Sequence, residues 1–140
     1  MTRVDFYVIS KQTGSDADQL SCRLTGKAFE RGQSVFIHVA SPEHAARLDD
    51  MLWTFRDSSF VPHARSGTSE ATGAPVLIGT QLTKAASNVL LNLTHPAPQR
   101  FSDFERVVEI VRTDPSERAK ARERYRFYQG QGITPTTHEL

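Results

Sequence analysis

The sequence predicts a single α/β domain whose sheet is mostly parallel and is covered by helices on both faces. Short runs rich in β-branched and aromatic residues alternate along the chain with segments of helical periodicity. The length of 140 residues is typical of one domain, and neither an internal repeat nor a long linker divides the chain. We therefore expect one domain over residues 1–130, followed by a polar C-terminal tail over 131–140.

The first half of the chain predicts two strands, each followed by a helix. Residues 4–9 and 34–40 combine β-branched and aromatic side chains, which favour strands. Residues 16–31 place apolar side chains at spacings of three and four, which is typical of an amphipathic helix. The second helix begins at Ser41, an N-cap residue followed by proline, and runs to about Trp53.

The second half of the chain predicts four more strands and two more helices. The expected strands are 59–63, 75–78, 88–93 and 107–111. Residues 64–74 are rich in Gly, Ser and Thr, which indicates a surface loop. Helical patterns occupy 101–106 and 114–129, and the second of these opens with Asp-Pro-Ser-Glu and ends before glycines.

Composition narrows the class of protein. The apolar runs are only a few residues long, whereas a membrane span needs about 20. The N-terminus lacks the pattern of a signal peptide, so we expect a cytoplasmic protein. The formal net charge of +1 is too small for the protein as a whole to be attracted electrostatically to DNA or to an anionic membrane. The single cysteine, Cys22, excludes an internal disulfide and a cysteine-based zinc site.

The motifs that bind phosphate in α/β sheets are missing. The dinucleotide fingerprint is absent after the first strand, and Gly26-Lys27 is followed by alanine where a P-loop needs serine or threonine. The predicted sheet is therefore Rossmann-like but lacks phosphate-binding loops. The five histidines show no helical metal-site spacing, and no nucleophile elbow is present. We expect no catalytic residue, no metal site and no cofactor.

The last helix carries an unusual concentration of positive charge. Residues 118–126 contain five cations and one acid, although the whole chain is nearly neutral. On a helix, Arg118, Arg122 and Arg126 fall along one stripe, Tyr125 lies at its edge, and Arg124 points away. A cationic stripe beside an aromatic residue suits a short acidic peptide. The alternatives are a solvated basic face and direct binding of nucleic acid by this helix.

Large aromatic residues gather where the second helix ends. Trp53 closes this helix, and Phe60 follows in the next segment. Such side chains either complete the core or, if exposed, mark a partner interface, where aromatic residues are enriched. The composition of the segment does not separate these two interpretations.

Several blocks of the sequence form a distinctive series along the chain. The blocks are Phe6-Tyr7, R-L-D-D-M-L-W at 47–53, S-F-V-P-H at 59–63, G-A-P-V at 73–76, and A-R-E-R-Y-R-F-Y at 121–128. In their order and spacing, these blocks resemble the chi subunit family of bacterial DNA polymerase III. The resemblance covers nearly the whole chain. The loop over 64–73 and the tail over 131–140 match the family poorly.

The resemblance implies a non-catalytic accessory subunit of the clamp-loader assembly, with a nucleotide-binding-like fold that binds no nucleotide. It implies a heterodimer with the psi subunit, for which a helicase-like protein can compete. It also implies binding to the acidic C-terminal tail of single-stranded DNA-binding protein, so that nucleic acid is contacted only indirectly. A degenerate nucleotide-binding-like domain remains an alternative function.

The resemblance also assigns residues to two surfaces. The tail-binding positions that match the family pattern are Arg118, Arg122, Tyr125 and Arg126, with Val111 lining an apolar pocket. The surface for psi corresponds to Trp53 and Phe60.

Overall fold

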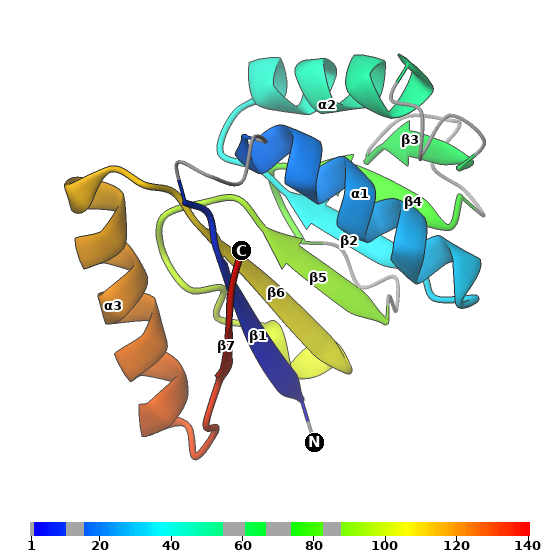
Figure 1. The fold of residues 1–140 in the computed structure, drawn as a ribbon. Coiled ribbons are helices and arrows are strands. Elements are labelled where there is room, and N and C mark those ends of the chain that lie inside the picture. Colours follow the sequence, from blue (N-terminus) through cyan, green and yellow to red (C-terminus); the bar gives the residue numbers. More distant parts are fainter. Residues whose placement is uncertain (1, 11–15, 55–60, 67–73, 83–87) are drawn as a thin grey trace.

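The computed structural model describes residues 2–10, 16–54, 61–66, 74–82 and 88–140 (Figure 1). The elements within these residues are β1 (Arg3–Val8), α1 (Ala17–Glu30), β2 (Val35–His38), α2 (Pro42–Thr54), β3 (His63–Arg65), β4 (Val76–Gly79), β5 (Val89–Asn92), the 3₁₀ helix η2 (Phe101–Asp103), β6 (Arg106–Val111), α3 (Pro115–Gly130) and β7 (Thr136–Glu139).

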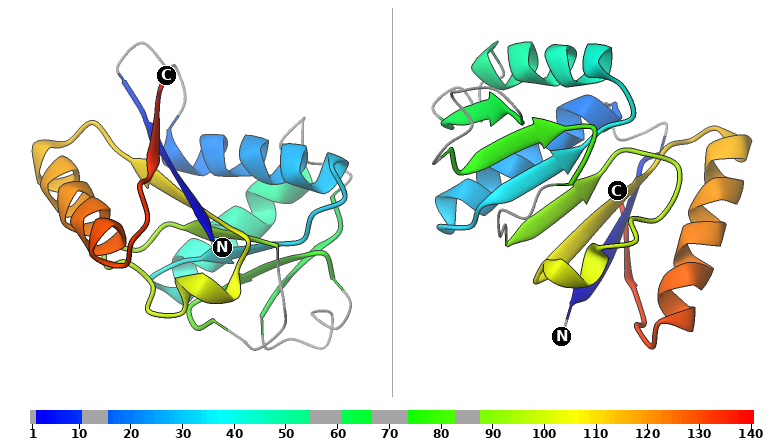
Figure 2. Two further views of the ribbon diagram at one scale, coloured as in Figure 1. Left: turned by 90° about the horizontal axis from the view of Figure 1, so that it is seen from below. Right: turned by 180° about the vertical axis from the view of Figure 1, so that it is seen from behind.

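The expected α/β class is confirmed. In the described part of the chain, seven strands form one sheet in the order β3-β4-β2-β5-β6-β1-β7, and every neighbouring pair is parallel. Helices α1 and α2 cover one face of this sheet, and α3 covers the other (Figures 1 and 2). No helix among the described residues is both long enough and apolar enough to cross a membrane.

The two faces of the sheet enclose two separate apolar layers because side chains alternate along each strand. On β6, Val108 and Ile110 pack under α1 and α2, whereas Val107 and Val111 pack under α3. The layer under α1 and α2 also holds Cys22, which is fully buried. Burial raises the pKa of its thiol to about 12, so this cysteine is protonated and unreactive at neutral pH.

Four segments differ from the sequence prediction. Residues 64 and 65, expected in a loop, continue β3, because Ala64 is buried and Arg65 pairs with Asp49 on α2. The helix expected at 101–106 is only the short η2, because Phe104 is extended and buried and Arg106 already belongs to β6. The strand expected at 59–63 begins at His63, and its first two residues lie outside the described part of the chain.

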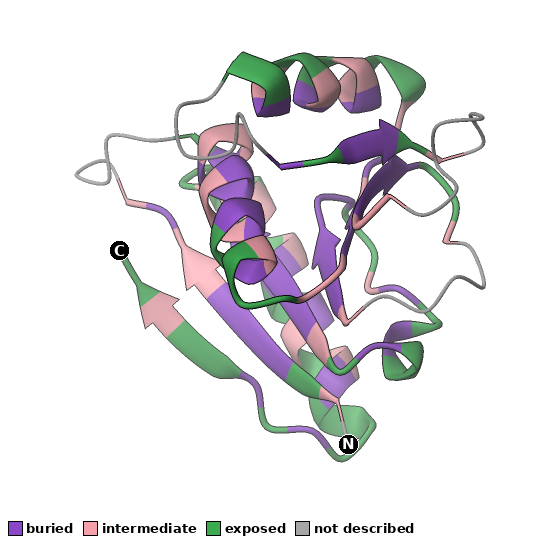
Figure 3. Ribbon diagram, turned by 90° about the vertical axis from the view of Figure 1, so that its right-hand side faces the viewer, coloured by how far each residue is buried: buried purple, intermediate pink, exposed green. Residues whose placement is uncertain are grey.

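The fourth difference lies in the segment that we expected to be a polar tail, which contains β7. Gly132, with φ of 84°, turns the chain after α3, and β7 then pairs in parallel with β1. Figure 3 shows β7 at the edge of the sheet, largely exposed, beside the buried β1. An edge strand needs only the backbone of its neighbour and tolerates polar side chains on both faces, so its sequence carries no apolar alternation.

Candidate functional site

Helix α3 is held on the sheet by a buried charged group. Glu109, in the middle of β6, is fully buried and faces the helix. The Nε atom of Arg124 lies 2.9 Å from Glu109 Oε1, and the hydroxyl of Tyr128 donates to Glu109 Oε2 at 2.6 Å. The amide of Asn92 on β5 donates to both carboxylate oxygens. Burial raises the pKa of Glu109, and the guanidinium of Arg124 opposes this rise.

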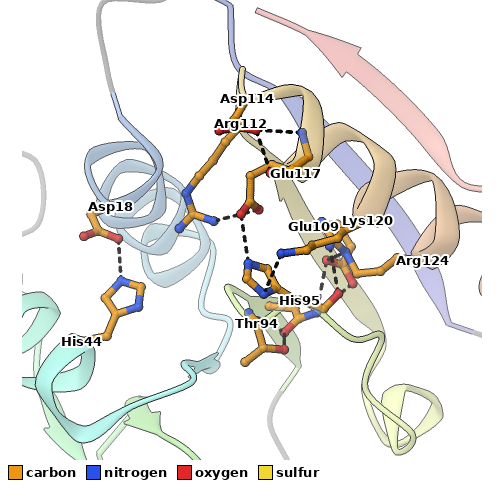
Figure 4. Close-up of polar contacts among 12 residues, drawn as sticks. Asp18, His44, Thr94, His95, Glu109, Arg112, Asp114, Glu117, Lys120 and Arg124 are labelled. Atoms are coloured by element: carbon orange, nitrogen blue, oxygen red, sulfur yellow. Dashed lines mark hydrogen bonds and ion pairs between the residues drawn. The ribbon is translucent and has the colours of Figure 1, made fainter.

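The same side of α3 makes a second set of contacts, with the segment after β5. His95 Nε2 lies 3.0 Å from Glu117 Oε1, and Lys120 Nζ lies 3.5 Å from His95 Nδ1 (Figure 4). Nη1 of Arg124 donates to the carbonyl oxygen of His95 at 2.9 Å. Two of the five cations of the basic helix, Lys120 and Arg124, therefore face partners within the chain.

The other three cations of the basic helix face solvent. Arg118, Arg122 and Arg126 are exposed, and none of them forms an ion pair with another described residue. Asp114 fixes where the helix begins, because its carboxylate accepts the backbone N–H of Ser116 at 2.7 Å. Within the helix, the spacing of four residues places the three arginines along one stripe.

A pocket of about 180 Å³ opens between α3 and strands β1, β6 and β7. Its volume is similar to the roughly 150 Å³ apolar cavity that holds a benzene ring in another protein. The ring of Tyr125 packs against that of Phe6, with centroids 5.4 Å apart. The pocket has an apolar floor and a rim with two arginines; it is lined by Phe6, Val8, Val111, Arg118, Ala121, Arg122, Tyr125 and Thr137.

The structure brings together four of the five residues assigned to the tail site. Val111, Arg118, Arg122 and Tyr125 line the pocket, whereas Arg126 is exposed and outside its lining. Their role in binding a tail stays a prediction.

The sequence prediction missed four pocket residues. Phe6 and Val8 share a strand face by their spacing of two, and Ala121 lies on the core-facing stripe, so these had a signal. Thr137 had none, because β7 itself was not expected.

The aromatic surface is described only in part. Trp53 is 55% exposed at the end of α2, so it does not belong to the core. The centroids of the Trp53 and His63 rings are 4.1 Å apart, and His63 Nε2 lies 3.1 Å from Asp49 Oδ1. Phe60 lies outside the described residues.

Comparison with known proteins identifies the family. The family model described as "DNA polymerase III chi subunit, HolC" matches residues 1–136. The chain is 41% identical to the DNA polymerase III subunit chi of Pseudomonas aeruginosa, over 100% of this chain and 98% of the relative. It is 31% identical to the corresponding subunit of Escherichia coli, over 98% and 97%, and 26% identical to that of Haemophilus influenzae, over 96% and 95%. The chain belongs to the DNA polymerase III chi subunit family.

Proposed function

We propose that this protein is a non-catalytic adaptor of the polymerase III clamp-loader assembly in the cytoplasm, and that it binds the acidic C-terminal tail of single-stranded DNA-binding protein at the α3 pocket. One observation supports this proposal above the others. An apolar pocket large enough for one aromatic ring lies directly beside exposed arginines without an ion-pair partner among the described residues. An acidic peptide that ends in phenylalanine matches both properties.

The geometry suggests how such a tail binds. The terminal ring enters the pocket against Val111 and Phe6, and the terminal carboxylate pairs with Arg122, which lies at the centre of the stripe. Aspartates that precede the ring lie along Arg118 and Arg126. Bonds between guanidinium and carboxylate groups are charge-assisted and therefore among the stronger polar contacts.

We assign a second protein partner to the surface around Trp53. An exposed tryptophan is costly in water and is enriched at the centres of interfaces. The proposed partner is the psi subunit, or a helicase-like protein that competes with it. This surface lies at the end of α2, and the tail pocket lies under α3 on the other face of the sheet, so both partners can bind together.

A pocket-filling substitution tests the tail site without removing any charge. Thr137→Tyr should fill the pocket from β7 and lower the affinity for an acidic, Phe-terminated peptide about tenfold or more, because burying a phenylalanine ring contributes about 1.5–3 kcal/mol. The measurement is a calorimetric titration. Thr136→Tyr is the matched control, since Thr136 is exposed on the same strand and faces away from the pocket. Equal affinities of the two variants would exclude this pocket.

Direct binding of nucleic acid by the three exposed arginines is the second candidate. It needs the stripe but no pocket. Titration of the same two variants with single-stranded DNA separates the functions. Micromolar binding of DNA that Thr137→Tyr leaves unchanged, together with no binding of the peptide, would favour the nucleic-acid function.

A further inference from the structure

Strand β7 forms the outer wall of the pocket, yet it is attached to the sheet along one side only. Thr137 lines the pocket, and β7 is the last strand in the sheet order, with β1 as its neighbour. Thr137 is opposite Phe6 in the register. A wall at the edge of a sheet keeps its place only as well as its contacts with the neighbouring strand hold it.

The side chains that hold β7 lie on the face of the sheet opposite the pocket. Because successive residues alternate, Thr137 points to the pocket and His138 points away from it. His138 Nε2 lies 3.0 Å from Asp5 Oδ1. The imidazole also stacks on the ring of Tyr7, with centroids 4.6 Å apart and planes 17° from parallel.

The acceptor of this contact is itself firmly placed. Asp5 is 2% exposed, and its other oxygen accepts from Arg106 Nε at 2.7 Å and from Arg3 Nε at 3.1 Å. Arg106 Nη2 donates to the hydroxyl of Tyr7 at 2.8 Å, so both β1 partners of His138 share one guanidinium. Burial of Asp5 works against ionisation, but the hydrogen bonds from Arg106 and His138 hold its pKa below the ordinary value, so it is an ionised acceptor at neutral pH.

We propose that His138 is a positioning residue for the tail pocket: its contacts with Asp5 and Tyr7 fasten β7 to β1 and thereby keep Thr137 in the pocket wall. This inference rests on the proposed function of the pocket. His138 does not line the pocket, so it acts through the strand and not by touching the tail. The hydrogen bonds of Leu140 N to Val8 O and of Ser10 Oγ to Leu140 O hold the far end of β7, so loss of His138 loosens the strand without detaching it.

The experiment measures the binding of two peptides and the hydrogen–deuterium exchange of backbone amides, all on the full chain. In His138→Ala, affinity for the acidic, Phe-terminated peptide should fall about fivefold, the order of one ordinary hydrogen bond, because the loss reaches the pocket only through the strand. A matched peptide that ends in alanine should bind both proteins equally, because it does not use the pocket. The loss should be the same at low and high salt, since no charge on the α3 stripe is removed. The amides of β7 should exchange with deuterium faster, while those of β6 and α3 should not.

Two further variants separate positioning from general damage. His138→Gln keeps a donor toward Asp5 and should restore part of the affinity. Thr136→Ala removes a side chain from the same face of β7 and should change neither affinity nor exchange.

The outcomes distinguish this inference from the proposed function. If the unaltered protein binds the Phe-terminated peptide and His138→Ala binds it equally, or if β7 exchange does not rise, the positioning role is wrong and the tail site stands. If the unaltered protein binds neither peptide, both proposals are wrong.

Discussion

Arg122 and Arg124 lie two residues apart on α3 but have opposite surroundings. Arg124 is 4% exposed and pairs with the buried Glu109, whereas Arg122 is exposed at the rim of an apolar pocket. The sheet causes the difference: β6 presents a carboxylate under one side of the helix and Val111 under the other. The role of a cation in this basic helix therefore depends on the strand beneath it and does not follow from the charge count.

The largest effect should follow from breaking the buried pair. Arg124→Ala leaves the carboxylate of Glu109 without its cation, and removal of one partner of a buried ion pair costs about 3–5 kcal/mol. The free energy of unfolding, measured by urea denaturation, should fall by an amount in this range. Arg124→Ala/Glu109→Gln should recover part of the loss, because no buried charge remains. Unchanged stability of the single variant would contradict a structural role of Arg124.

Arg122→Ala should have the opposite effect: it should weaken peptide binding and leave the stability nearly unchanged. Because Arg122 is exposed and forms no ion pair within the described chain, the free energy of unfolding should change by less than about 0.5 kcal/mol. Affinity for the acidic, Phe-terminated peptide should fall at least about tenfold, since loss of one partner of a desolvated pair costs about 2–5 kcal/mol. Calorimetry and denaturation on the same preparation measure both. A variant that loses stability and keeps its affinity would reverse the roles of the two arginines.

The N-cap residue of α3, Asp114, should stabilise the folded protein in a pH-dependent way. Hydrogen bonds from the side chain and backbone of Ser116 hold the pKa of Asp114 below its ordinary value of 3.8. Because this pKa is lower in the folded state than in the unfolded chain, the ionised cap contributes its full stabilisation at pH values above the ordinary pKa. This stabilisation is lost as the pH falls through the lower pKa of the folded state. Asp114→Ala should therefore lower the Tm at pH 7, and the difference from the unaltered protein should disappear in strong acid. A difference that grows toward acid would refute this.

The smallest effect should come from Lys120. It carries the same charge as Arg122 but faces His95 on the other side of the helix, in an exposed contact at 3.5 Å. Lys120→Ala should change stability by less than about 0.5 kcal/mol and peptide affinity by less than about twofold. Lys120 is a better charge control than Arg124, which is buried. Equal losses of affinity in Lys120→Ala and Arg122→Ala would indicate a diffuse basic face instead of a shaped site.

The helical stripe could be predicted from sequence because it depends only on the period of the helix. Arg118, Arg122 and Tyr125 meet at the pocket for this reason, and Val111 came from the family resemblance. The burial of Arg124 could not be predicted from α3 alone, because its partner lies on a strand. A signal for that partner did exist: the single acid in Val-Val-Glu-Ile-Val at 107–111 interrupts a fully apolar strand, which indicates a buried charge with a bound cation.

The limits of the fold prediction have a similar origin. Elements that bury an apolar face, such as α1 and β2, follow from periodicity. Elements defined by tertiary contacts do not: β3 depends on contacts of its polar residues with α2, and β7 on backbone pairing with β1. Since β7 supplies Thr137, the missed strand and the missed pocket wall are one error.

The buried pair between Glu109 and Arg124 also has a mechanical consequence. In the proposed adaptor, a bound partner tail exerts its pull on Arg122. The buried ion pair of Arg124, two residues further along the helix, holds α3 to the sheet. Because Glu109 is also bonded to Asn92, tension on α3 passes into β5 and β6, in the middle of the sheet. An adaptor between two moving assemblies can thus bear a pulling force on the surface helix α3 while that helix stays attached to the sheet.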